Sequence, residues 1–118
     1  MAVSENLEIW HNPRCSKSRQ TLALLEEQGL SPKIRLYLED GPDIETMRKV
    51  LLALNKSPAE IIRNKDALFK DLCLSTDLPE AALIDAMVAN PALIERPIVR
   101  QGNKARLGRP PEDVLEIL

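Results

Sequence analysis

The sequence predicts one α/β domain, residues 1–118, in which a β-α-β unit comes first, helices fill the middle and a β-β-α unit comes last. Three observations indicate this order. Short apolar runs lie near both ends, amphipathic helical stretches occupy the middle, and turn residues separate the elements. A chain of 118 residues has the usual length of a single domain and can bury a core without disulfide bonds.

The first unit begins with the apolar run Leu7–Trp10, which is typical of a short buried strand. An Asn-Pro pair ends this run soon afterwards. A helical pattern extends from Ser16 to Gln28, and Gly29 suits the position after the helix because glycine adopts positive φ easily. Residues 33–38 then alternate polar and apolar side chains, which predicts a second strand.

Three helices are predicted in the middle of the chain. Residues 43–54 carry apolar side chains at helical spacing. Residues 57–60 read Ser-Pro-Ala-Glu, a capping box with proline at the first helical position, which predicts a helix start. A third helix begins at Pro79 and ends before Pro91, since a residue that precedes proline avoids the α region. Cys73, between these helices, is interpreted as a half-buried packing residue.

The last unit contains a hairpin and a helix. Residues 97–99 are a short apolar run, and residues 101–103 read Gln-Gly-Asn, which is typical of a hairpin turn. The return strand is expected over residues 105–108 and the last helix over residues 114–118. Parallel strands need a crossover helix between them. A β-α-β start with a β-β-α finish is the thioredoxin/glutaredoxin arrangement, and the middle helices form an insertion in it.

Charge and composition exclude several classes of function. The formal net charge of −2 argues against a nucleic-acid binder that relies on general attraction, and three aromatic residues are too few for a base-stacking surface. No apolar run is long enough to span a membrane and no signal-peptide pattern is present, so we expect a cytoplasmic protein with reduced thiols. The two cysteines form no metal-binding pattern, so we expect no metal site and no bound cofactor.

Cys15 is the strongest candidate for a reactive residue. Only a thiolate is nucleophilic, and an ordinary cysteine is mostly protonated at neutral pH. A place in the first turn of a helix supplies unpaired N–H groups and the positive end of the helix dipole, which lower the pKa of a thiol. The basic side chains of Arg14, Lys17 and Arg19 act in the same direction. The alternative, a small packed residue in a turn, stays open at this point.

Two polar neighbours strengthen the case for a reactive thiol. His11 adds positive charge if it is protonated, and Ser18 can donate a hydrogen bond to a thiolate. The N–H groups at a helix start also bind oxyanions. The residues alone therefore indicate a candidate thiolate beside a candidate anion site.

Five motifs extend this interpretation. They occur in a fixed order over nearly the whole chain: His-Asn-Pro-x-Cys-x-x-Ser-Arg at 11–19, Tyr-Leu at 37–38, Ile-Arg-Asn at 62–64, Glu-Arg-Pro-Ile-Val at 95–99 and Ala-Arg-Leu-Gly-Arg-Pro at 105–110. This ordered set resembles the glutaredoxin-coupled arsenate reductase family, which is thioredoxin-like, and in particular its short bacterial members.

The resemblance implies a role for each residue of the first motif. Cys15 corresponds to the nucleophile, His11 to a histidine that helps to lower its pKa, and Ser18 to a serine that supports the thiolate. The implied reaction reduces arsenate, or a similar oxyanion, through a thiol-arsenate adduct on Cys15. Glutathione, a co-substrate, attacks the adduct, glutaredoxin helps to reduce it, and arsenite leaves. We expect a monomer that works with these partners and with neither nucleic acid nor membrane.

The resemblance also implies an oxyanion site. Arg63, Arg96 and Arg106 correspond to three arginines that hold the oxyanion, and Pro97 corresponds to a proline that is cis in thioredoxin-like folds. Two like unit charges about 4 Å apart repel by about 4 kcal/mol at an effective dielectric constant near 20. The attack of a thiolate on an oxyanion therefore needs converging guanidinium groups.

Two other functions stay open at this point. One is a related glutathione-linked thiol oxidoreductase with another substrate, such as a glutathione mixed disulfide. The other is a non-enzymatic regulator like the Spx-type transcription factors, which share the fold and bind RNA polymerase. Those regulators usually carry a Cys-x-x-Cys switch, whereas Ser18 occupies the second position here. Three arginines together with His11 favour oxyanion chemistry.

Overall fold

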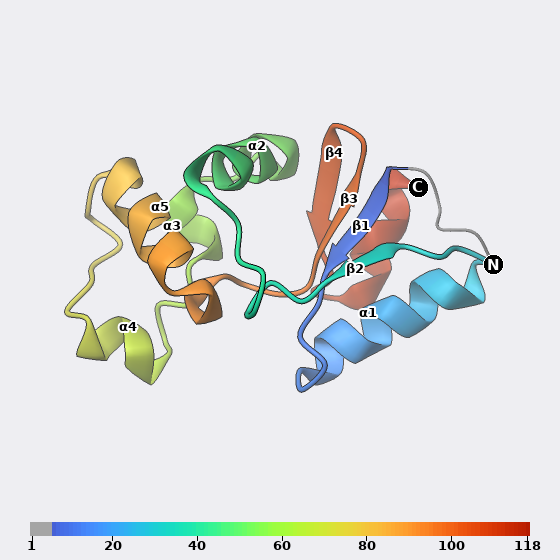
Figure 1. Ribbon diagram of the computed structural model, residues 1–118, viewed down its shortest axis with the longest axis horizontal. Coiled ribbons are helices and arrows are strands. Elements are labelled where there is room, and N and C mark those ends of the chain that lie inside the picture. Colours follow the sequence, from blue (N-terminus) through green and yellow to red (C-terminus); the bar gives the residue numbers. More distant parts are fainter. Residues whose placement is uncertain (1–5) are drawn as a thin grey trace. The chain divides into compact units, whose positions relative to one another are not determined.

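A computed structural model describes residues 6–118 (Figure 1). The chain forms two compact units: the sheet unit comprises the residues up to Asp40 together with Arg96–Leu118, and the helical unit comprises Gly41–Glu95. The helical unit corresponds to the insertion predicted from the sequence. The prediction that the whole chain is a single domain stays a prediction.

The sheet unit has the predicted order of elements. They are β1 (Leu7–Trp10), α1 (Ser16–Glu27), β2 (Lys33–Arg35), β3 (Ile98–Gln101), β4 (Lys104–Leu107) and the 3₁₀ helix η2 (Pro111–Ile117). The strands form one sheet in the order β2-β1-β3-β4, in which β1 is parallel to β2 and antiparallel to β3, and β3 is antiparallel to β4. This is the β-α-β and β-β-α arrangement, so the predicted fold class is confirmed.

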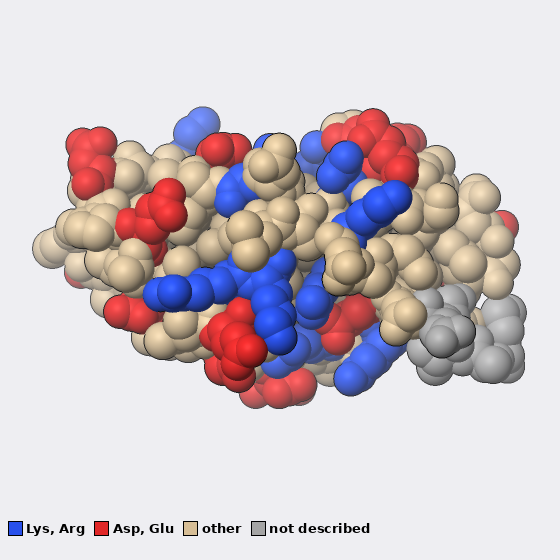
Figure 2. Space-filling model, turned by 90° about the horizontal axis from the view of Figure 1, so that it is seen from above, with Lys and Arg blue, Asp and Glu red and all other residues tan. Residues whose placement is uncertain are grey.

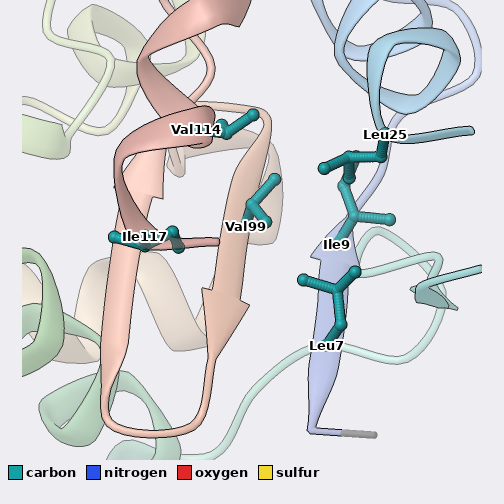
Figure 3. Packing of buried hydrophobic residues seen from close by; sticks show 6 residues of the cluster. All are labelled: Leu7, Ile9, Leu25, Val99, Val114 and Ile117. Carbon is teal, nitrogen blue, oxygen red and sulfur yellow. The ribbon is translucent and has the colours of Figure 1, made fainter. Parts of the chain in front are cut away.

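One face of the sheet is covered by α1 and η2 (Figure 3). A core of six buried side chains lies there: Leu7 and Ile9 of β1, Val99 of β3, Leu25 of α1, and Val114 and Ile117 of η2. Alternate residues of a strand share a face, so Leu7 and Ile9 point to the same side of the sheet. Val99 of β3 pairs with Ile9 of β1 and therefore lies on that side as well. Each such burial contributes about 1.5–3 kcal/mol. This packing fixes α1, and with it the residue at its N-terminus, against the sheet.

The second strand differs from its prediction in length and in orientation. β2 ends at Arg35, whereas the alternating pattern ran to Leu38. Ile34 is 49 % exposed, whereas Tyr37, grouped with the polar residues by the pattern, is completely buried. The reason is aromatic packing: the ring of Tyr37 stacks on Trp10 with centroids 6.5 Å apart, and a buried aromatic ring removes more apolar area from water than a leucine does.

The helical unit begins after the turn that follows β2. Its elements are α2 (Ile44–Leu54), α3 (Pro58–Ile61), α4 (Ala67–Asp71), α5 (Glu80–Ala89) and the 3₁₀ helix η1 (Pro91–Leu93). Asp43 caps α2 by accepting the Thr46 N–H at 2.7 Å, and the capping box predicted at Ser57 opens α3. α5 packs against α2, α3 and η1. The three helix starts predicted in this region are therefore confirmed.

Helix α4 was not predicted, and Cys73, which follows it, was placed wrongly. Phe69 is the only residue of α4 that is buried, and one buried side chain gives no periodic pattern. The chain leaves this short helix in the left-handed conformation, with φ of +55° at Cys73. The thiol of Cys73 is consequently exposed, not half-buried.

The surface carries mixed charge. Figure 2 shows Lys and Arg side chains interspersed with Asp and Glu side chains over the face in view, which agrees with the net charge of −2. Within residues 6–118, every helix is too short or too polar to cross a membrane.

We expect Ile9→Ala to destabilise the sheet unit by about 2–5 kcal/mol, because it leaves a cavity in the core under α1 and η2. Urea unfolding followed by the fluorescence of Trp10, the single tryptophan, measures the change. Leu115→Ala is the control, since Leu115 lies on η2 but is 38 % exposed, and it should cost less than about 1 kcal/mol. Equal losses in the two variants would contradict the description of this core.

Candidate active site

The loop between β1 and α1 holds Cys15 at the N-terminus of α1. The Asn12 side-chain oxygen accepts the Arg14 N–H at 3.0 Å, and the Asn12 carbonyl accepts the Cys15 N–H at 2.9 Å. The Arg19 guanidinium donates to the Pro13 carbonyl at 3.0 Å. Cys15 is the N-cap residue, with extended φ and ψ of −92° and 123°. Its half-buried thiol therefore lies beside the unpaired N–H groups of a 12-residue helix.

Opposing effects act on the ionisation of Cys15. Burial raises the pKa of the thiol, because it disfavours the charged form. Hydrogen bonds from the Ser18 N–H, the Arg96 side chain and the Lys17 N–H, together with the positive charge of Arg109, lower it. The lowering effects win, so the pKa of Cys15 lies below its ordinary value. The structure thus supports the thiolate that the sequence predicts.

Arg109 is a site residue that the sequence analysis did not assign. Its Nη2 lies 3.5 Å from the Cys15 Sγ, and its Nε donates to the Arg96 carbonyl at 2.7 Å. Arg106, to which the sequence analysis gave an oxyanion role, donates from Nε to the Glu116 carboxylate at 3.1 Å, and its oxyanion role stays a prediction. The structure therefore brings Arg96 and Arg109 to the sulfur, and it places the Arg106 guanidinium with η2.

Strand geometry explains this outcome. Arg106 pairs with Val99 in the register of β4 and β3, so its side chain lies on the sheet face that α1 and η2 cover. Arg109 lies beyond the end of β4, where strand alternation no longer applies. Both Arg96 and Arg109 precede a proline, and both of these peptide bonds are cis. The shared Arg-Pro sequence was the signal that could have pointed to Arg109.

His11 and Ser18 form a buried polar pair behind the thiol. The His11 Nδ1 lies 2.7 Å from the Ser18 Oγ, which also accepts the Asn12 N–H at 3.0 Å. Burial, and secondly the positive charge of Arg19, lower the pKa of His11. His11 is therefore neutral at pH 7 and adds no positive charge. The described contacts of the Ser18 hydroxyl go to His11 and Asn12, so Ser18 reaches the sulfur through its backbone N–H.

Close packing at Gly108 joins the end of β4 to the rest of the site. The Gly108 N–H donates to the Pro97 carbonyl at 2.9 Å. A Cβ at Gly108 would lie 2.7 Å from the Pro97 Cγ and would collide with the Thr21 Oγ1. Thr21 is completely buried, and its hydroxyl donates to the Lys17 carbonyl at 2.8 Å. A larger residue at this position would therefore force the Pro97 ring or the Thr21 side chain to move.

Arg63 belongs to the helical unit. Its Nε donates to Asp66 at 2.9 Å and its Nη1 to Glu95 at 2.6 Å. Burial lowers the pKa of Arg63, but the hydrogen bonds and charges of Asp66 and Glu95 outweigh it and raise the pKa above the ordinary value. Arg63 is a permanently charged residue held by two carboxylates, and its oxyanion role stays a prediction.

We expect Arg109→Met to raise the pKa of Cys15 towards that of an ordinary thiol, because the variant removes a positive charge beside the sulfur. The rate of iodoacetamide alkylation, measured against pH, gives this pKa directly. Arg106→Met is the matched control and should leave the alkylation midpoint unchanged. An unchanged midpoint in Arg109→Met, or equal shifts in the two variants, would show that Arg109 does not act on the thiol.

We expect Gly108→Ala to destabilise the sheet unit by about 1–3 kcal/mol through overpacking, and to alter the alkylation rate of Cys15. Gly102→Ala is the control, since Gly102 has φ of +60° and open space around it. That variant should lose about 1 kcal/mol from backbone strain alone and should keep the alkylation profile. Urea unfolding and alkylation of both variants make the comparison, and a normal profile in Gly108→Ala would rule out its proposed packing role.

Comparison with known proteins agrees with this geometry. The ArsC family profile matches residues 10–117. The uncharacterized protein YfgD of Escherichia coli (strain K12) is 52 % identical over 98 % of this chain and 99 % of its own length. An arsenate reductase of Haemophilus influenzae is 49 % identical over 93 % of this chain and 97 % of its own length. The solved arsenate reductase from Vibrio cholerae superposes with a TM-score of 0.91 and 48 % identity, over 95 % of this chain and 97 % of that one. The chain therefore belongs to the ArsC family.

Proposed function

We propose that the protein is a thiol-dependent arsenate reductase in which Cys15 is the nucleophile. The observation that carries this proposal is the Cys15 sulfur, which receives hydrogen bonds from helix N–H groups and from the Arg96 side chain, with Arg109 beside it. Such a sulfur is both a thiolate and the centre of an anion site. The arsenate reductases of Haemophilus influenzae and Vibrio cholerae support arsenate as the oxyanion.

The first step forms a bond between sulfur and arsenic. The Cys15 thiolate attacks the arsenic(V) of dihydrogen arsenate, and one arsenic–oxygen bond breaks. With one added proton the oxygen leaves as water, which gives a Cys15 thiol-arsenate adduct of charge −1. Arg96 and Arg109 screen the repulsion between thiolate and oxyanion, and they stabilise the charge that gathers on the arsenate oxygens in the transition state.

The second step transfers two electrons. A glutathione thiolate attacks the Cys15 sulfur of the adduct, a sulfur–sulfur bond forms, and the sulfur–arsenic bond breaks with its electron pair left on arsenic. With two protons taken up, arsenic leaves as arsenous acid, reduced from the +5 to the +3 state. The Cys15–glutathione disulfide then exchanges with a glutaredoxin thiolate, which returns Cys15 to its thiolate form. Because glutathione and glutaredoxin are reductants of the cytoplasm, the proposed reaction takes place there.

The buried His11–Ser18 pair positions the reacting group. A neutral His11 cannot stabilise the thiolate by charge. Its hydrogen bond to the Ser18 hydroxyl, which also accepts the Asn12 N–H, instead holds the first turn of α1 against the loop. The Ser18 N–H then stays directed at the sulfur, and the donor is in place before the anion arrives.

We expect Cys15→Ser to abolish arsenate reduction and Cys73→Ser to leave the rate unchanged within about twofold, because an exposed substitution rarely changes a free energy by more than about 0.5 kcal/mol. NADPH oxidation, coupled through glutathione reductase to glutathione, glutaredoxin and arsenate, measures the rate. Equal losses in both variants would make Cys73 a resolving thiol and would reject the single-cysteine mechanism. Activity retained in Cys15→Ser would reject the proposed function.

A further inference from the structure

A pocket of about 240 Å³ lies beside the loop that carries Cys15. One wall is residues 11–14, which lead directly into Cys15, and the other wall is Leu36, Leu38 and Glu39 from the segment after β2. The His11 N–H donates to the Arg35 carbonyl at 2.8 Å, which ties the two walls together at one end. The pocket is therefore built on the same backbone that fixes the thiol.

The walls combine apolar side chains with two opposite charges. Leu36 and Leu38 are 39 % and 44 % exposed, so they offer apolar surface to a ligand. Arg14 and Glu39 are both exposed. Within residues 6–118, their polar contacts are made by backbone N–H groups only, to the Asn12 side chain and to the Leu36 carbonyl respectively. Both charged side chains are thus available to bind a zwitterionic molecule.

We propose that this pocket binds the glutathione that attacks the Cys15 adduct, an inference that rests on the proposed function. Glutathione carries carboxylates and one ammonium group on a tripeptide that also bears a thiol. The Arg14 guanidinium is a planar donor that suits a carboxylate, and the Glu39 carboxylate suits the ammonium group. Leu36 and Leu38 pack against the methylene groups between these charges.

The length of glutathione is compatible with a thiol that reaches from the pocket to Cys15. Arg14, at the edge of the pocket, is the residue next to Cys15 in sequence, and consecutive Cα atoms lie about 3.8 Å apart. An extended tripeptide spans about 10 Å. Arg14 lines the pocket and Cys15, the next residue, lies outside it, so in this proposal a glutathione held by Arg14 extends its central cysteine out of the pocket towards the sulfur of Cys15, where the disulfide of the second step forms.

Titration of the full-length ¹⁵N-labelled protein with S-methylglutathione, which cannot react, tests the pocket by NMR. We expect the amide signals of Arg14, Leu36, Leu38 and Glu39 to shift. Arg14→Gln and Glu39→Gln should each weaken binding about tenfold, which corresponds to one charge-assisted hydrogen bond of about 1.4 kcal/mol. Arg48→Gln, an exposed arginine of α2, is the matched control and should bind normally.

Kinetics separate this inference from the proposed function. In Glu39→Gln we expect the KM for glutathione to rise about tenfold, while the rate with 2-mercaptoethanol, which lacks both charges, stays the same. The pocket proposal would be overturned if S-methylglutathione shifted none of these four amide signals, or if it bound Arg14→Gln and Arg48→Gln equally well. If the unmodified protein still reduced arsenate, the proposed function would stand. If these amide signals shifted but the protein reduced no arsenate with any thiol, the pocket would still be a glutathione site and arsenate would be rejected as the substrate.

Discussion

The set of hydrogen bonds to the Cys15 sulfur is the interaction on which the rest of the site depends. A half-buried sulfur loses hydration, and burial alone would keep it protonated and inert. The N–H groups of Lys17 and Ser18 and the side chain of Arg96 replace the lost water and favour the charged form. Because these donors belong to the fold, they are in place around the sulfur before any substrate is bound.

Packing at a distance from the sulfur sustains this arrangement. The Ile9, Val99 and Leu25 side chains fix α1 on the sheet, which sets where the first N–H groups of the helix point. Gly108 lets the end of β4 approach α1 closely, and the chain beyond it delivers Arg109. These core side chains and Gly108 thereby help to position the groups that surround the thiol.

The sequence predicted what local patterns determine. The strand at Leu7–Trp10, the capping box at Ser57 and the place of Cys15 at a helix start all follow from neighbouring residues, and the structure has each of them. It did not predict features that depend on tertiary packing. Tyr37 is buried because Trp10 offers a stacking surface, and which arginine reaches the sulfur depends on where β4 ends.

The charges of the sheet unit explain how a protein of net charge −2 can present an anion site. At physiological ionic strength, charges more than about 8 Å apart are largely screened, so the net charge matters less than the groups beside the sulfur. Those groups are Arg96 and Arg109. Glu116, on η2, partly neutralises Arg106, and His11 is uncharged. Arg96 and Arg109 thus supply local positive charge at the thiol, where an oxyanion has to lose its water and meet a second anion.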